Sequence, residues 1–544
     1  MSTAADLQPP RGPDDRPPRE LPTEPLHERS HEPSDESAGG TQRTRERAWS
    51  AVPLLRRLHF YAGVLVAPFL VVAALTGLAY VFTPQLDNLV YADELRVATV
   101  AGQARPLTEQ VAAAQAAHPT GTLTTVVPAS AADTTTQVVF ALPELGDRQH
   151  TVYVDPYTAQ VRGTLVTWFG STPLTTWLDD LHRNLHLGWF GRMYSELAAS
   201  WLWVLVAGGL VLWLRQHRRG RSRLRRALLP DLGARNVRRT RGWHAATGIW
   251  LSVGLLVLSA TGLTWSRWAG AHFDTALTAL DAKRPTLDLA LPDGAPAPHG
   301  QHHSAGADPA AVDPATVERV LGHARRAGLT GPVEIATPTE PGLAWTVTQA
   351  DNTWPVRLDQ LAVDPVTGPV ARSDFADWPL LAQLSKLGIQ AHMGRLFGWV
   401  NQVLLGALAV GLLCVIVWGY RMWWQRRPTR SDRRTFVGPP PERGTWRFLP
   451  RPLLALALLP LAALAWALPT FGATLLAFLV LDALLARRRA TQAPGTTGRS
   501  GANGGHPSSA GTHSPRTSGE MPRTSGEGLR TSGEGLRTSG ESGS

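Results

Sequence analysis

The chain has 544 residues, of which 43% are hydrophobic and 18% charged, and its formal net charge is +10. Its mean hydropathy of −0.10 is that of a basic soluble protein, but the average hides an uneven distribution of apolar residues. The single cysteine, Cys414, excludes a disulfide framework, a covalently attached c-type haem and a cysteine-ligated iron–sulfur cluster.

The apolar residues are concentrated in a few long segments. Four of them cover 58–86, 197–214, 243–266 and 396–420. Each has at least the roughly 18 residues that a helix needs to cross a hydrocarbon core of about 30 Å. A fifth, 452–481, is interrupted by Pro460 and Pro469 and predicts either one kinked helix or a hairpin of two helices. We therefore expect an α-helical integral membrane protein with a four-helix core and a C-terminal hairpin.

The segments between these helices differ in composition. Both chain ends are polar, and the tail repeats the motif RTSGE without the apolar pairs of a coiled coil, so both ends are predicted to be disordered. Arginine is concentrated in two of the loops, which predicts that these loops and both termini are cytoplasmic. The net positive charge therefore reflects these cytoplasmic loops and does not indicate nucleic-acid binding. In chain order, the predicted segments are a disordered N-terminus (1–50), a first membrane helix (51–86), an external domain (87–180), a second membrane helix (181–215), an arginine-rich loop (216–241), a third membrane helix (242–268), a second external domain (269–391), a fourth membrane helix (392–424), a cytoplasmic loop (425–451), a membrane hairpin (452–486) and a disordered tail (487–544).

The sequence contains an internal repeat. The segment with His59 and the tripeptide T-G-L at 76–78 returns with His244 and T-G-L at 261–263. The motif V-D-P-x-T occurs at both 154–158 and 363–367, and each external segment reads as a helix followed by short strands. The pattern predicts a tandem duplication of helix, α+β external domain and helix.

Histidines lie at the ends of the predicted membrane helices. His59 and His244 are at the cytoplasmic ends of the first and third helices. Alignment of Gly188 with Gly394 pairs His186 with His392 at the outer ends of the second and fourth helices. An ionisable side chain at membrane depth indicates function, and two pairs at opposite faces suit two bis-histidine haems of the non-covalent b type.

Three further features bear on these sites. His182 lies one turn before His186 on the same helix face. Three arginines at the helix ends are candidate partners for haem propionates: Arg57, Arg241 and Arg395. Three histidines in a Pro/Gly-rich external stretch are candidates for loose transition-metal binding or copper handling: His299, His302 and His303.

The chain resembles the PepSY-associated transmembrane family, which includes iron-regulated membrane proteins and ferric-siderophore reductases of the bacterial inner membrane. The residues that carry the resemblance are R-L-H-x-x-x-G…T-G-L at 57–78, L-H-R-x-L at 181–185, G-W-H-x-x-x-G…T-G-L-T at 242–264, H-x-G-R-x-F-G at 392–398 and the two V-D-P-x-T motifs. The resemblance implies PepSY-like external domains and haems that carry electrons from the cytoplasmic side to a ferric chelate outside. It also puts weight on His182, so both His182 and His186 are candidates for the outer ligand.

The resulting hypothesis is an inner-membrane di-haem protein that passes electrons to an external acceptor, in the first place a ferric siderophore. Because no dinucleotide-binding fingerprint follows a strand, the donor must be a separate quinol or cytoplasmic reductase. The alternative is a non-enzymatic PepSY-domain membrane protein that binds peptides or proteases, or assists metal transport.

Overall fold

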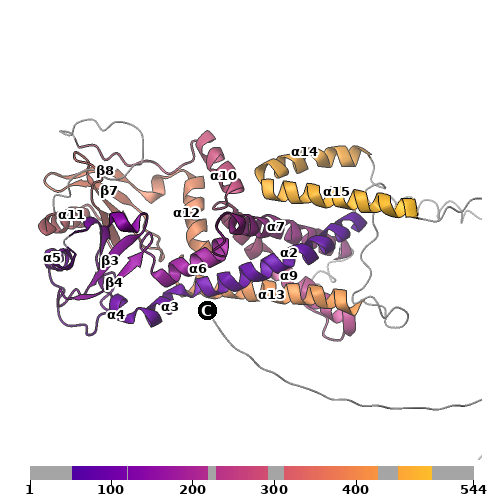
Figure 1. Ribbon diagram of the computed structural model, residues 1–544, viewed down its shortest axis with the longest axis horizontal. Coiled ribbons are helices and arrows are strands. Elements are labelled where there is room, and N and C mark those ends of the chain that lie inside the picture. The colour runs from indigo at the N-terminus through magenta and orange to yellow at the C-terminus, as the bar shows by residue number, and fades with distance from the viewer. Residues whose placement is uncertain (1–51, 119, 218–227, 292–311, 427–450, 493–544) are drawn as a thin grey trace, which may run out of the picture. The chain divides into compact units, whose positions relative to one another are not determined.

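The computed structural model describes residues 52–118, 120–217, 228–291, 312–426 and 451–492 (Figure 1). The predicted disordered N-terminus, residues 493–544 of the predicted disordered tail and the cluster of His299, His302 and His303 lie outside these residues. Residues 487–492, which were predicted to belong to the disordered tail, are helical.

Four long helices form a bundle: α2 (Val52–Val81), α7 (Gly188–His217), α9 (Asn236–Leu263) and α13 (Trp399–Gln425). Helices α2 and α9 each pack against both α7 and α13, so the four enclose a common core (Figure 1). Within the described ranges, these four are long and apolar enough to cross a membrane. The hydrophobic core between them includes Val66, Leu70, Leu255 and Leu412. The predicted four-helix membrane core is therefore present.

The C-terminal segment is a hairpin of two helices, α14 (Arg451–Ala467) and α15 (Pro469–Gln492). Pro469 starts α15, where its missing N–H costs no hydrogen bond. The apolar stretches of these helices, Leu458–Ala467 and Pro469–Leu485, are shorter than those of the four long helices. Helix α15 is joined to α7 by a hydrogen bond from the Trp201 indole to the Thr474 hydroxyl (2.9 Å).

Eight antiparallel strands form one sheet. The first half of the chain contributes β1 (Thr122–Val127), β2 (Thr136–Ala141), β3 (Gln149–Val154) and β4 (Val161–Thr167). The second half contributes β5 (Val333–Ala336), β6 (Trp345–Gln349), β7 (Gln360–Asp364) and β8 (Gly368–Ser373). The strand order is β4-β3-β2-β1-β5-β6-β7-β8. The sequence predicted two separate external domains, whereas β1 pairs with β5 and makes the two sets of strands a single sheet.

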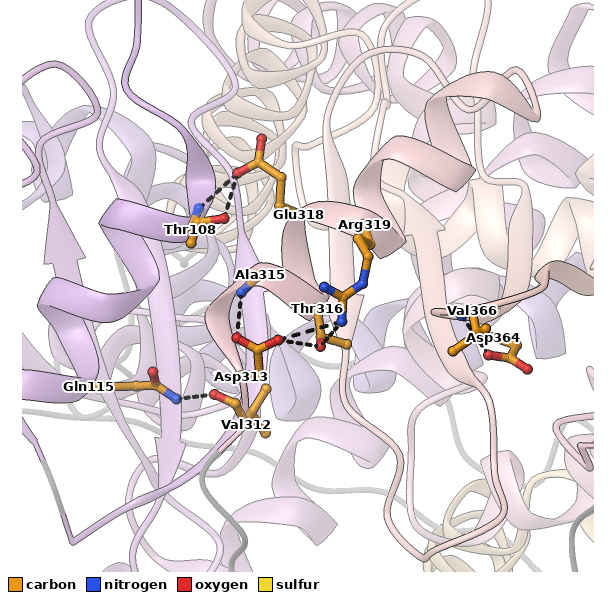
Figure 2. A network of polar contacts seen from close by, with 10 residues as sticks. All are labelled: Thr108, Gln115, Val312, Asp313, Ala315, Thr316, Glu318, Arg319, Asp364 and Val366. Atoms are coloured by element: carbon orange, nitrogen blue, oxygen red, sulfur yellow. Dashed lines mark hydrogen bonds and ion pairs between the residues drawn. The ribbon is translucent and has the colours of Figure 1, made fainter.

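Helices α5 (Leu107–Ala117) and α11 (Pro314–Arg326) cover one face of this sheet (Figure 1). Val111 and Val320 from these helices are fully buried against valines and isoleucine of the strands. Burial of each such side chain contributes about 1.5–3 kcal/mol. Figure 2 shows the polar contacts between the two helices, where the backbone N and hydroxyl of Thr108 donate to Glu318 at 2.8 and 3.1 Å. The two halves of the chain thus share one core.

Short helices connect the sheet to the bundle. Helix α6 (Pro173–Asn184) precedes α7, and α12 (Leu380–His392) precedes α13. Helix α6 packs on α2 and α7, and α12 packs on α9. The remaining short elements are α3 (Thr83–Val90), α4 (Ala92–Leu95), η1 (Pro143–Leu145), α10 (Trp268–Ala279) and η2 (Phe375–Asp377).

The connection between α6 and α7 departs from the predicted continuous helix 181–215. Leu185, His186 and Gly188 all have positive φ, between 54° and 55°, so the chain leaves the helical conformation after Asn184. The side chain of His186 therefore projects from a turn rather than from the face of α6 that carries His182.

Candidate functional site

The first histidine pair consists of His182 on α6 and His392 at the end of α12. Their ring centroids are 6.4 Å apart and the ring planes are inclined by 45°. His186, which the sequence alignment had matched with His392, is exposed and its ring lies 5.0 Å from that of Trp177. The pairing of His186 with His392 is therefore corrected to His182 with His392, because the turn after Asn184 directs His186 elsewhere.

Threonines orient both rings of this pair. The Nδ1 atoms of His182 and His392 lie 2.9 Å from the hydroxyls of Thr76 and Thr261 respectively. Each hydroxyl also lies 2.8 Å from the carbonyl oxygen one turn earlier, at Val72 or Val257. Since a hydroxyl has one hydrogen and donates it to that carbonyl, the histidine Nδ1–H is the second donor. The Nε2 atom of each ring therefore keeps its lone pair.

Glycines provide the space for the same two rings. A Cβ atom on Gly77 would lie 3.0 Å from Cε1 of His182, and one on Gly262 would lie 3.3 Å from Cε1 of His392. In each repeated Thr-Gly dipeptide, the threonine thus orients the histidine ring and the glycine leaves space for it.

The second pair consists of His59 on α2 and His244 on α9. Their ring centroids are also 6.4 Å apart, with the planes inclined by 83°. Nδ1 of His244 lies 2.9 Å from the carbonyl oxygen of Val415. Nδ1 of His59 is beside the backbone of Leu205 but makes no hydrogen bond of normal geometry there.

Glycines also flank the second pair. A Cβ atom on Gly209 would lie 3.3 Å from Cε1 of His59, and one on Gly419 would lie 3.8 Å from Cε1 of His244. These glycines belong to α7 and α13. Their role was not found from the sequence, because the signal is a spatial contact between helices that are far apart along the chain.

The separation of the rings fits one metal ion per pair. A metal–imidazole bond is about 2 Å long and an imidazole centre lies about 1.1 Å from its nitrogen, so two imidazoles on opposite sides of one ion have centres about 6.2 Å apart. Both pairs match this value. The described residues contain no cluster of three or more histidine, cysteine or acidic side chains that would make a tetrahedral protein-only metal site. His59 with His244, and His182 with His392, are therefore the two pairs of residues that would each hold a haem iron.

The His182 and His392 rings are in the state that ligation requires. Both residues lie on the short helices, outside the four membrane-spanning ones. Burial lowers the pKa of each imidazole to about 4, and for His392 the neighbouring His182 lowers the pKa further. Both rings are therefore neutral at pH 7.

The two pairs lie at opposite ends of the bundle. On α2, His59 and the Thr76 that orients His182 are separated by about five turns, or about 26 Å. Each pair takes one histidine from the first half of the chain and one from the second. Neither half alone contains a complete pair.

The three arginines that are candidate partners for haem propionates differ in exposure and in contacts. Arg57, only 3% exposed, forms an ion pair with Asp482 of α15 and lies over the Tyr61 ring at 5.4 Å. Arg241 and Arg395 are exposed, and Arg395 lies beside the Tyr80 hydroxyl. The sequence did not predict the contact of Arg57, although an aspartate within the apolar 452–486 segment was a visible signal.

Comparison with known proteins places these features within one family model. The model, described as PepSY-associated TM region, matches residues 56–426. The match includes both histidine pairs, the four long helices and the sheet, and it ends before α14. No curated protein matches the chain.

Proposed function

The chain belongs to the PepSY-associated transmembrane family, and we propose that it is a di-haem membrane protein that carries electrons across the bilayer. The observation that carries the proposal is the pair of ring separations of 6.4 Å, one at each end of the bundle. His59 and His244 would hold one haem, and His182 and His392 the other. The haems are of the b type, because the one cysteine cannot make a thioether pair.

A haem between two imidazoles supplies a one-electron Fe(III)/Fe(II) couple when bound. The residues of the chain hold the imidazoles neutral and oriented. Thr76 and Thr261 fix the tautomer of His182 and His392 through Nδ1, and the Val415 carbonyl does so for His244. The hydrophobic core between the pairs excludes water from the path between them.

The distribution of arginine along the chain supports one orientation of the protein in the bacterial inner membrane. The arginine-rich segments 216–241 and 425–451 follow the ends of α7 and α13 that lie beside His59 and His244. By the positive-inside rule this end is cytoplasmic, as are both termini, and the sheet is external. Electrons would then enter at His59/His244 from a quinol or cytoplasmic reductase and leave at His182/His392. The tandem duplication explains why each half supplies one ligand to each haem.

The acceptor that this arrangement suits best is an external ferric chelate of the siderophore type. Reduction lowers the charge of the iron and makes it softer, so hard-oxygen chelators hold it less tightly. The reaction would therefore release iron outside the membrane for uptake.

Haem stoichiometry tests the proposal. Purified full-length chain should contain two b-type haems that dithionite reduces, measured as the pyridine haemochrome. His59→Ala and His392→Ala should each retain one haem, and the control His186→Ala should retain two. A protein without any reducible b-type spectrum would refute the proposal.

The sheet edges support a second, non-enzymatic function. Strands β4 and β8 end the sheet, and an extended peptide can add to an edge strand through main-chain hydrogen bonds. The chain would then be a membrane-anchored peptide- or protease-binding protein. Copurification of a bound peptide with haem-free protein would favour this function over electron transfer.

A further inference from the structure

A third pair of histidines lies on the sheet domain. His118 directly follows α5, and His150 lies on β3. Their Nε2 atoms are 3.0 Å apart and their ring centroids 4.1 Å apart. Both side chains are half-buried, and the His118 ring packs against Phe140 at 6.1 Å. Neither histidine has a part in the proposed electron path.

Rigid elements hold both side chains. The backbone N of His118 donates to the carbonyls of Ala114 and Gln115, which fixes the residue to the end of α5. His150 is paired with Phe140 on β2 and with Val166 on β4, so its strand has neighbours on both sides. The two imidazoles are therefore brought together by the fold rather than by mobile loops.

The distance between the two nitrogens matches a chelating pair. Two nitrogens that each lie about 2 Å from one ion are about 2.8–3.4 Å apart when the angle between the bonds is about 90–110°. Two rings that met head-on across a 3.0 Å hydrogen bond would have centroids about 5.2 Å apart. The observed 4.1 Å means that the rings meet obliquely. Two ligands whose nitrogens lie 3.0 Å apart on one ion would have centroids about 4.6 Å apart, so the observed rings are about 0.5 Å from that geometry and about 1.1 Å from the head-on one.

The second half of the chain has other residues at the positions that correspond to His118 and His150. When the V-D-P motifs are aligned, Ala327 and Asp359 occupy the positions of His118 and His150. There Arg372 donates to the Ala327 carbonyl at 2.7 Å and pairs with Asp359 at 3.7 Å. A polar link between helix end and strand is thus common to both halves. Only the first half builds the link from two metal-binding side chains.

We propose that His118 and His150 chelate a first-row transition-metal ion of the Cu²⁺ or Zn²⁺ class on the sheet domain. Imidazole suits these ions, and Cu²⁺ binds most tightly in the series. Water completes the coordination, since the described residues offer no third ligand. This site is independent of haem.

Copper binding to the full-length protein tests the proposal. The parent protein for this experiment carries the substitutions His299→Gln, His302→Gln and His303→Gln, so that the external histidine cluster cannot contribute. Cu²⁺ titration followed by EPR should show one strongly bound ion whose spectrum has nitrogen superhyperfine lines. His118→Gln and His150→Gln should each weaken this binding at least about tenfold. His186→Gln, which changes an exposed histidine outside the pair, should leave it unchanged.

Two outcomes would overturn the site. One is a parent protein that binds no Cu²⁺ at micromolar concentration. The other is binding that neither substitution weakens, which would leave the pair as an imidazole–imidazole hydrogen bond only. Each variant is compared with a parent of the same haem content and melting temperature, so a misfolded variant is recognised. Because only the difference between parent and variant is counted, a failure of the haem proposal would not change the result.

Discussion

The first half of the chain, 52–217, and the second half, 236–425, bring one histidine each to both ends of the bundle, but their connections differ in length. After His182 the chain reaches α7 at Gly188, whereas after His392 it reaches α13 at Trp399. The environments of the two histidines are nevertheless the same, with a threonine hydroxyl at 2.9 Å and a glycine beside the ring. The ligand geometry is thus maintained while the connection varies.

The largest expected effect is a difference in haem content between the variants of His182 and of His186. His182→Ala should lower the haem content from two to one per chain, because the proposed ligand of one iron is lost. His186→Ala should retain two, since this side chain lies beside Trp177 outside the pair. Pyridine haemochrome measurements on both variants decide the matter. The reverse result would restore the alignment of His186 with His392.

An asymmetry between the halves gives the second prediction. Arg57 of the first half pairs with Asp482, whereas the repeat puts Gly242 at the corresponding position of the second half. Asp482→Asn leaves a buried arginine without its carboxylate and should destabilise the protein by about 3–5 kcal/mol. Unfolding in detergent, followed by circular dichroism, measures the loss. In the double variant Arg57→Met/Asp482→Leu, stability should recover. Equal stability of the single variant and the parent would contradict the role of the ion pair.

The glycines beside the outer pair should differ in their tolerance of a methyl group. Gly77→Ala brings a Cβ to 3.0 Å from the His182 ring, and Gly262→Ala brings one to 3.3 Å from the His392 ring. Overpacking costs about 1–3 kcal/mol, so Gly77→Ala should lower haem retention more than Gly262→Ala. Gly248→Ala is the matched control, because no atom lies within 4 Å of its added carbon. A control variant as damaged as Gly77→Ala would indicate a general helix effect instead.

The smallest effect should be equal in the two halves. Thr76→Val and Thr261→Val keep the shape of the side chain and remove the acceptor of the Nδ1 hydrogen. Each should cost about 1 kcal/mol and shift the midpoint potential of the same haem. Redox titration of the α-band measures the shift. Unequal shifts would mean that the two threonines, despite equal distances of 2.9 Å, have different roles.

The membrane helices and the histidines at their ends were predictable from the sequence, because charge-free segments of sufficient length have few other structures available. The choice between His182 and His186 was not, since it depends on the left-handed backbone at Leu185 and His186. The pairing of β1 with β5 also escaped prediction, because antiparallel partners far apart in sequence leave no local pattern. The Arg57–Asp482 contact is similarly non-local.

The junction between β1 and β5 has a consequence for assembly. These are the first strands of the two halves, and they pair antiparallel through Thr125 with Ala336 and Val126 with Ile335. In a two-fold symmetric dimer, an isologous interface likewise pairs an edge of one subunit with the same edge of the other subunit. The pairing of β1 with β5 within one chain thus resembles the contact between two subunits of such a dimer. A half-length chain would expose β1 as an open edge and would need a second copy both to cover it and to complete each histidine pair.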